Sequence, residues 1–253
     1  MNTTKPLFRL CAISALLLAA SALQAATFTW GAPQNITGIS DVSTNGSLIG
    51  AFNVGDTGVS STTGNGVSFQ SFAVPSSSLG ATQGNFTISS TSSFNLSNTA
   101  FGSANAPFSA LSPAYQTLLA AATSNPALFT LTMAGLIVGM QYEFQWWANH
   151  SFTGSAAGRQ HTASAGNTVT LDDDPSNTNG GVGQYALGTF TADAATQSIV
   201  FGGPQQALLN GFQLRRIGGT SAVPESGQTL NLLALSLGGV AFPRRRLAGA
   251  PSS

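Results

Sequence analysis

The segment QYEFQWWAN, residues 141–149, decides the fold because apolar and polar side chains alternate along it with a period of two. Alternation of this kind predicts a β-strand, since successive side chains of a strand point to opposite faces. One face carries a large apolar set that is expected to be buried in a core: Tyr142, Phe144, Trp146 and Ala148. A central strand of a β-protein is therefore expected here.

The other face of this strand combines one aromatic ring with amides and a carboxylate: Trp147, Gln145, Asn149 and Glu143. Sugars stack on exposed aromatic rings while amides and carboxylates bind their hydroxyls, so this set predicts a carbohydrate-binding surface. The alternative is that a loop, or a helix expected over residues 112–124, covers Trp147 and forms a second core. The exposed fraction of Trp147 distinguishes the two.

Short alternating segments between Gly, Asn and Ser turns continue on both sides of this strand. In residues 66–74, Val67 and Phe69 face opposite to Phe72 and Val74, which predicts burial on both sides of that strand. The pattern as a whole predicts an all-β fold. We expect a single β-sandwich of jelly-roll type over residues 26–217, with about nine strands and one inserted helix.

The inserted helix has recognisable ends. Ser112 can cap its first turn, and Pro113 suits the first helical position. Apolar residues then recur on one face, and Asn125-Pro126 is expected to end the helix.

Three segments of this domain resemble the galactose-binding-like β-sandwich modules of secreted bacterial proteins: GLIVGMQYEFQWWAN (135–149), GTFTAD (188–193) and LNGFQLRR (209–216). In those modules a Gly-x-x-Tyr turn leads into a central strand, and a final strand closes the sheet. The resemblance implies a fold. It does not establish a ligand, because one fold hosts many functions.

The chain begins with a secretory signal peptide, residues 1–25. It has a basic start at Lys5 and Arg9, an apolar stretch, and a small-residue exit, with cleavage expected after Ala25. Export through the Sec machinery follows from this. The single cysteine, Cys11, lies inside the signal, so the mature chain has no disulfide, thiolate metal ligand or cysteine nucleophile.

The chain ends in three parts within residues 223–247. A polar motif, VPESG (Val223, Pro224, Glu225, Ser226, Gly227), precedes an apolar run over 229–242 and then Arg244, Arg245 and Arg246. Fourteen helical residues span about 21 Å, which is short of the roughly 30 Å bilayer core and on length alone favours a core helix. Arginines directly after an apolar run instead favour a short transmembrane helix. Residues 218–222 are expected to be a linker, and 248–253 a tail.

This three-part order resembles the PEP-CTERM family of sorting signals, in its VPDSG-type variant with Glu225 in place of Asp. The resemblance implies an exosortase-type membrane peptidase that recognises Val223–Gly227, in a Gram-negative bacterium that often makes extracellular polysaccharide. It also implies transient residence in the inner membrane, followed by the cell surface or extracellular matrix.

Charge excludes nucleic-acid binding. Between the two signals three arginines stand against seven acidic residues, and no basic patch exists that could neutralise phosphates.

Few residues could carry catalysis. His150 and His161 are the only histidines, no nucleophile-elbow or HExxH motif is present, and both are expected to be loop histidines with ordinary hydrogen bonds. A glycosidase needs two facing carboxylates, for which Glu143 with Asp172 or Asp174 is the pair to test.

The acidic loop LDDDPSNTNGG, residues 171–181, offers hard oxygen ligands from Asp172, Asp174, Ser176 and Asn177. It lacks the EF-hand spacing. A solvated turn and a weak calcium site are the two interpretations.

The sequence therefore predicts an exported, non-catalytic β-sandwich without a cofactor, sorted to the cell surface or matrix and associated with extracellular polysaccharide. The alternatives are a specific carbohydrate-binding module that uses Trp147, and a secreted glycan hydrolase that uses Glu143 with Asp172 or Asp174.

Overall fold

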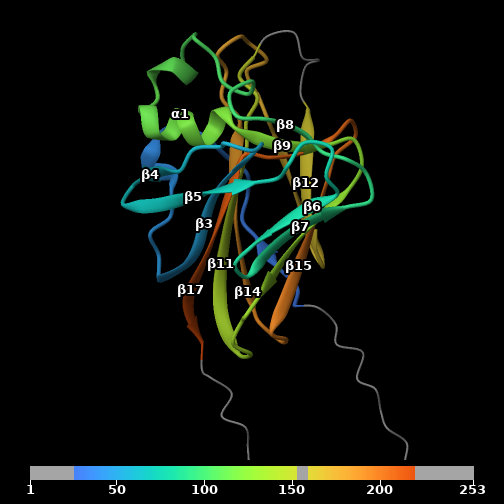
Figure 1. Cartoon of the computed structure of the whole chain (residues 1–253). Coiled ribbons are helices and arrows are strands. Elements are labelled where there is room, and N and C mark those ends of the chain that lie inside the picture. Colours follow the sequence, from blue (N-terminus) through green and yellow to red (C-terminus); the bar gives the residue numbers. More distant parts are fainter. Residues whose placement is uncertain (1–25, 153–158, 220–253) are drawn as a thin grey trace, which may run out of the picture.

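A computed structural model describes residues 26–152 and 159–219. The predicted signal helix, the sorting motif, the apolar segment and Arg244 to Arg246 lie outside these residues. The described chain folds as two large β-sheets packed face to face, with a small third sheet and one α-helix at one end (Figure 1). The predicted all-β sandwich with one inserted helix is confirmed.

The first sheet has eight strands in the order β1-β14-β11-β17-β3-β5-β4, with β2 paired to β14. Among the described strands, β3 and β5 are the one pair that runs parallel. The strands are β1 (Thr29–Trp30), β2 (Gln34–Asn35), β3 (Ser47–Gly55), β4 (Thr62–Gly64), β5 (Val67–Ala73), β11 (Met140–Ala148), β14 (Gln184–Thr191) and β17 (Gly211–Gly219).

The second sheet has six strands in the order β13-β12-β15-β10-β7-β6, and the third has three in the order β16-β9-β8. From β11 to β17 the chain passes repeatedly between sheets, with β11, β14 and β17 in the first, β12, β13 and β15 in the second, and β16 in the third. The strands are β6 (Gly80–Gln83), β7 (Phe86–Ser90), β8 (Asn95–Ser97), β9 (Ala122–Asn125), β10 (Phe129–Ala134), β12 (Gln160–Ala165), β13 (Asn167–Asp172), β15 (Thr196–Gly202) and β16 (Ala207–Leu209).

The main core lies between the two large sheets. All four apolar residues predicted for the inner face of β11 are buried in it, so that prediction is confirmed. Phe144 stacks on Phe212 of β17, and Trp146 meets Phe201 of the opposite sheet edge to face. Aromatic pairs in these geometries add to the free energy gained by burial.

Strand β5 contributes to two cores, as its sequence predicted. Phe72 and Val74 belong to the main core, whereas Val67 and Phe69 point to the outer face of the first sheet and pack in a second core. This second core also contains Trp147 and the buried face of the helix.

The helix α1 (Pro113–Ala120) starts where the sequence predicted. Ser112 Oγ accepts a hydrogen bond from the backbone N–H of Tyr115, and Pro113 occupies the first turn. Its predicted end is wrong, because residues 122–125 form β9 rather than a last helical turn. The β9 backbone pairs with β8 and β16, and these pairings outweigh the helix propensity of the alanines.

The predicted count of nine strands is too low. The strands predicted within residues 66–74 and 141–149 are present as β5 and β11, but the structure adds further, mostly short strands, such as β1, β2, β4 and β8. Two to four residues are too few to show an alternating pattern. Two short 3₁₀ helices, η1 (Ile39–Asp41) and η2 (Phe108–Ala110), were also not predicted.

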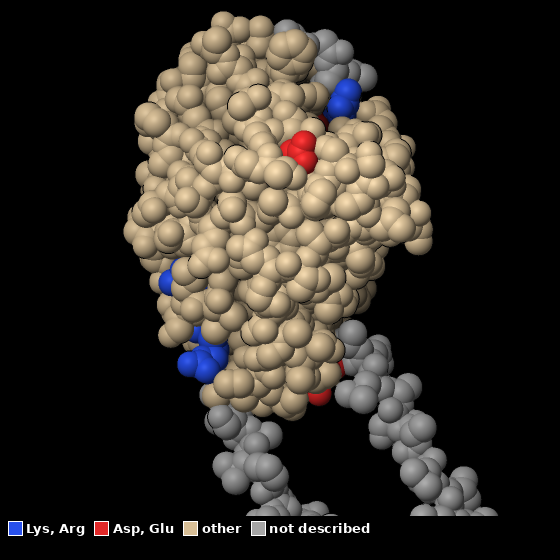
Figure 2. Space-filling view, viewed as in Figure 1, with Lys and Arg blue, Asp and Glu red and all other residues tan. Residues whose placement is uncertain are grey.

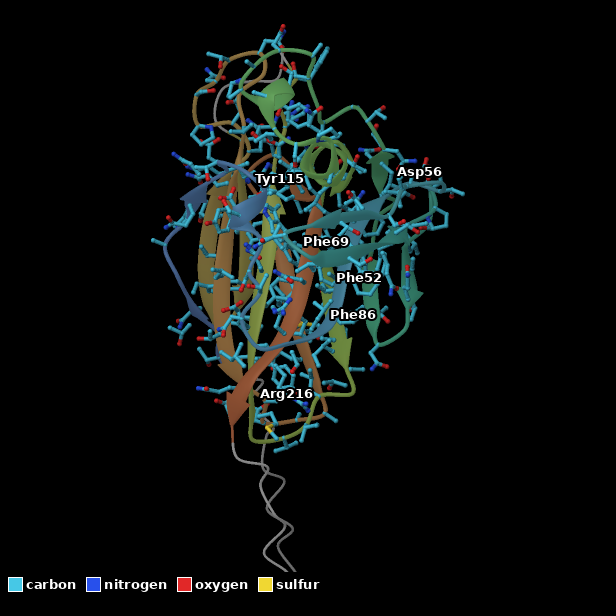
Figure 3. All side chains as sticks on the ribbon, turned by 90° about the vertical axis from the view of Figure 1, so that its left-hand side faces the viewer. Phe52, Asp56, Phe69, Phe86, Tyr115 and Arg216 are labelled. Atoms are coloured by element: carbon cyan, nitrogen blue, oxygen red, sulfur yellow. The ribbon has the colours of Figure 1, made fainter. Side chains whose placement is uncertain are left out.

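The first and last residues of the described sandwich lie together at one pole of the molecule, which we call the terminal end (Figure 1). The helix α1 lies at the opposite pole, which we call the α1 end. Figure 3 shows the same arrangement, with Arg216 at one end and Tyr115 near the other. Gly219 pairs with Met140 inside the first sheet, so the sandwich continues two residues beyond the predicted boundary at 217. Gly218 and Gly219, which the sequence assigned to the linker, therefore belong to β17.

Within residues 26–152 and 159–219, no helix has the length and apolar character needed to span a bilayer. Charged side chains are sparse on the face seen in Figure 2. This agrees with the low charge of the sequence, of which only 6% is Asp, Glu, Lys or Arg.

Candidate functional site

The predicted sugar platform at Trp147 is wrong. Its side chain is 0% exposed, and its ring meets Phe69 edge to face with 5.6 Å between ring centroids. The indole Nε1–H donates to the Tyr115 hydroxyl of α1 at 2.9 Å. The alternative interpretation, in which the helix covers Trp147 and completes a second core, is confirmed.

The other three residues of the predicted surface are buried as well. Gln145 accepts from Ser43 N and Gln213 Nε2 and donates to the backbone oxygen of Asp41 at 2.6 Å. Glu143 accepts from Ser43 Oγ and Asn45 Nδ2. The segment 36–46 therefore covers this face of β11. Because this segment shows no hydrophobic period, its role as a cover could not be predicted.

Arg215 holds the same cover in place. Its guanidinium donates to the backbone oxygens of Thr44, Asn45 and Gly46. Burial lowers the pKa of Arg215, and the nearby carboxylate of Glu143 opposes that shift. These groups build the sandwich, so they are not free to bind a ligand.

The predicted glycosidase pair is not brought together. Glu143 and Ala148 lie five residues apart on β11, which is about 17 Å of strand. Ala148 pairs with Gln184, whose side chain accepts from the Asp172 backbone N–H. Glu143 and the 172–174 run therefore lie well beyond the roughly 5–10 Å that paired carboxylates require.

In the 171–181 loop, Asp174 organises its own turn. Its carboxylate accepts hydrogen bonds from Ser176 Oγ and from the backbone N–H groups of Asn177 and Thr178. Asp172 accepts from Asp174 N, and Asn177 adopts a positive φ of 53°. Among the described residues no group of three or more acidic, His or Cys side chains is arranged to hold a metal ion. The weak calcium site stays a prediction.

One histidine is not the loop residue that was predicted. His161 lies on β12 and its side chain is buried. Both ring nitrogens have partners there: Nε2 lies 3.0 Å from Asp173 Oδ2, and Nδ1 lies 2.9 Å from the backbone oxygen of Gln206. His150 follows β11, with its Nδ1 3.9 Å from the same Asp173 oxygen, which is too far for a hydrogen bond. Burial lowers the pKa of His150, and Asp173 opposes that shift.

Acid is expected to destabilise the protein through His150. Its pKa is lower in the folded chain than the ordinary 6.5, so the unfolded chain takes up the proton first. The free energy of unfolding should then fall as pH drops below about 6.5, by at most about 1.4 kcal/mol per pH unit for one proton. The acidic groups that act on this ring are Asp173 and Asp174, and the basic groups are Arg159 and His161.

Urea unfolding at pH 7.5, 6.5 and 5.5 measures this dependence, and His150→Gln should flatten it. An equal slope in the wild type and in His150→Gln would contradict the assignment.

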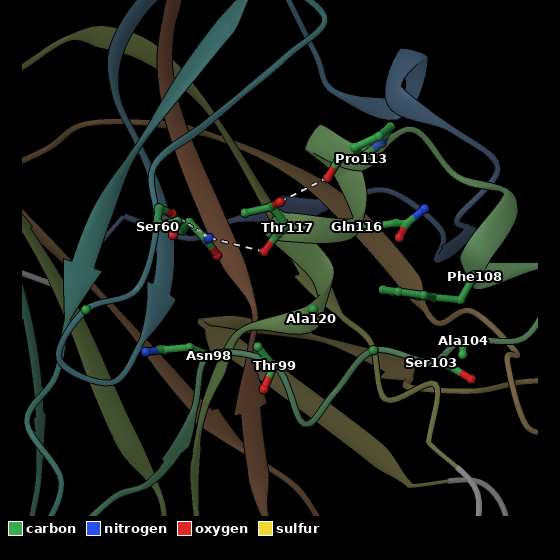
Figure 4. Close-up of a pocket in the computed structure, with 13 residues that line it drawn as sticks. Ser60, Asn98, Thr99, Ser103, Ala104, Phe108, Pro113, Gln116, Thr117 and Ala120 are labelled. Carbon is green, nitrogen blue, oxygen red and sulfur yellow. Dashed lines mark hydrogen bonds between the residues drawn. The ribbon is translucent and has the colours of Figure 1, made fainter.

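An open groove at the α1 end was not predicted from the sequence. It has a volume of about 780 Å³ and lies between α1 and the segment 98–104 (Figure 4). We call it the α1 groove. Among the described residues no charged side chain lines it; the lining residues are Asn53, Gly58, Ser60, Asn98, Thr99, Gly102, Ser103, Ala104, Phe108, Pro113, Gln116, Thr117 and Ala120.

Hydrogen bonds made by side chains that line the α1 groove hold its two walls in position. Thr117 Oγ1 donates to the Pro113 oxygen, and Asn53 Nδ2 donates to the backbone oxygens of Ser60 and Thr117 (Figure 4). On the facing wall, Asn98 Oδ1 accepts from the Asp56 backbone N–H.

A pair of buried asparagines joins the two walls from beneath. Asn149 donates to the backbone oxygens of Phe101 on one wall and Leu119 on the other. Asn210 donates to Leu119 and Ala121 and accepts from Asn149 N at 2.7 Å. Asn149 was predicted to bind sugar directly. Its observed role is to hold the two walls together.

Comparison with known proteins gives no family. No protein-family model matches the chain, and no curated protein matches it. One solved structure, the crystal structure of the ANX1 ectodomain from Arabidopsis thaliana, matches at 16% identity with a TM-score of 0.40. The match covers 66% of this chain and 41% of the other. A likeness this remote gives no information on function.

Proposed function

We propose that the chain is an exported surface or matrix protein whose β-sandwich is non-catalytic. Its signal peptide directs it through the Sec machinery, and an exosortase-type peptidase sorts it through Val223–Gly227 during transient residence in the inner membrane of a Gram-negative cell. The mature sandwich then stands at the cell surface or in the extracellular matrix, in contact with extracellular polysaccharide. The proposal requires no cofactor.

The observation that carries this proposal is the order of three parts at the C-terminus: the VPESG motif, the apolar run over 229–242 and the arginines at 244–246. The described fold is compatible with it. β17 ends at Gly219, only a few residues before the motif, and it ends at the terminal end of the sandwich. A chain held there leaves the α1 end free to meet other molecules.

The proposal that the sandwich is non-catalytic is supported by the hydrogen bonds in which three of its acidic side chains are engaged. Glu143 binds Ser43 and Asn45, Asp173 binds His161, and Asp174 caps its own turn. Each group acts in a structural hydrogen bond instead of facing a cleft, whereas a catalytic acid or base needs access to substrate.

The intact mass of the mature protein from its own host tests the sorting. We expect an N-terminus at Ala26 and a C-terminus near Pro224–Gly227. A mass that retains Arg244 to Arg246 would contradict processing and would indicate a lasting membrane anchor. Replacing Val223–Gly227 by alanines provides the control, because it should leave export unchanged and abolish the processed mass.

A further inference from the structure

We propose that the α1 groove binds a neutral saccharide. This rests on the proposed function, because a location outside the cell is what makes polysaccharide the available polyhydroxyl ligand. The site is distinct from the buried Trp147 face, and none of the four residues first predicted to bind sugar lines it.

The chemistry of the lining points to an uncharged, hydrogen-bonding ligand. Hydroxyl and amide groups dominate the groove, and each hydroxyl can both donate and accept, as sugar hydroxyls do. An anionic polymer would find no Lys, Arg or His in the lining, and a cation would find no carboxylate. The volume of about 780 Å³ lies within the range of roughly 300–1,000 Å³ that is usual for small-molecule sites.

Several of these polar groups have no partner among residues 26–152 and 159–219. They include the hydroxyls of Ser60 and Thr99 and the side-chain oxygen of Gln116. The Nε2 group of Gln116 donates to the backbone oxygens of Ser109 and Leu111, and Oε1 accepts no hydrogen bond from the described residues. The strongest indication is Asn53, whose side chain is 0% exposed and whose Oδ1 accepts no hydrogen bond within the described chain. A buried amide oxygen without a partner is costly. Asn53 lies directly behind the surface of the groove, so a small shift of the wall would let a ligand hydroxyl or water reach this oxygen.

The groove also provides an apolar surface. The accessible apolar side chains of its lining are Ala104, Pro113 and Ala120 (Figure 4). The Phe108 ring is only 3% exposed and packs in the second core, so it supports this surface and does not itself contact a ligand. A C–H face of a sugar can rest on the three accessible side chains while its hydroxyls meet the polar walls. The groove lies at the α1 end, away from the terminal end where β17 leads to the predicted sorting motif.

The test is calorimetric titration of the protein recovered from cells that express the full chain. The probes are neutral tetrasaccharides of glucose, galactose, mannose and N-acetylglucosamine, with tetragalacturonate as the anionic comparison. We expect at least one neutral probe to bind, with an affinity that does not change with salt, and no binding of tetragalacturonate. Binding of tetragalacturonate alone, weakened by salt, would overturn the proposal.

Three variants locate the binding. Ala104→Trp places a large side chain in the groove and should lower the affinity at least tenfold. Thr99→Val removes one hydroxyl and should lower it roughly 2–10-fold. Ala110→Trp is the matched control, since Ala110 is exposed but does not line the groove, and its affinity should equal that of the wild type.

The outcomes separate this proposal from the proposed function. If no neutral probe binds, or if the Ala104→Trp and Thr99→Val variants both bind as the wild type does, the groove proposal is overturned, while the intact mass still decides the sorting. If the mass shows no processing but groove binding is present, the sorting fails and the saccharide site stands.

Discussion

Replacement of Trp147 by alanine should lower the free energy of unfolding by about 3–5 kcal/mol, the usual cost of truncating a buried aromatic side chain. Trp147 is fully buried between the first sheet and α1, so its removal leaves a cavity in the second core. It also leaves the Tyr115 hydroxyl without its donor. Urea unfolding of the purified protein measures the loss, and hydrogen exchange should show the α1 amides to be less protected.

Two variants show whether packing or the hydrogen bond dominates. Trp147→Phe keeps most of the ring and loses the Nε1–H donor, so it should cost less than Trp147→Ala. Phe152→Ala is the exposed aromatic control, since Phe152 is 60% exposed, and it should change stability by less than about 0.5 kcal/mol. Equal effects of Trp147→Ala and Phe152→Ala would refute the buried placement.

Replacement of Asn210 by alanine should cost about 2–5 kcal/mol, because buried backbone groups lose their partners. The amide of Asn210 donates to the oxygens of Leu119, Ala121 and Asn149 and accepts from the Asn149 N–H, and the side chain is 0% exposed. The Leu119 carbonyl would keep a partner in the variant, because it also accepts a hydrogen bond from the Asn149 side chain. The groups left without a partner are therefore mainly the Ala121 carbonyl and the backbone N–H and carbonyl of Asn149.

Asn210→Asp is the sharper variant. It has nearly the same shape, but at neutral pH it directs a carboxylate at three carbonyl oxygens, so it should be less stable than Asn210→Ala and should recover in acid. Asn95→Ala is the matched control, because Asn95 is exposed and its side chain makes no hydrogen bond within the described residues. A cost for Asn210→Ala no larger than that for Asn95→Ala would contradict the bridging role.

The alternation along β11 and β5 is sufficient to predict the central strand, the inner core and the burial of both faces of β5. Period-two patterns work here because burial selects every second residue. The same pattern assigns a residue to a face but does not say what covers that face. Trp147 illustrates this, since α1 and the segment 36–46 pack on this side of the sheet from positions distant in sequence.

The candidate site escaped prediction for the same physical reason. Asn98, Thr99 and Ser60 come from segments whose composition indicates only turns, and their meeting depends on tertiary contacts. The Asn210 amide donates to Leu119 in the last turn of α1 and to Ala121 just after it, and this meeting also depends on the folded arrangement. The end of α1 was misplaced because the pairing of β9 with β8 and β16 is invisible locally.

The position of Gly219 has a mechanical consequence. β17 is a central strand, hydrogen-bonded to β11 on one side and β3 on the other, and any tether that follows it pulls from its C-terminal end. A load applied at the α1 end would run along the strand direction, perpendicular to the inter-strand bonds. The two ladders would then be strained together in shear rather than unzipped bond by bond, an arrangement suited to a protein held at one point while a polymer pulls at the other.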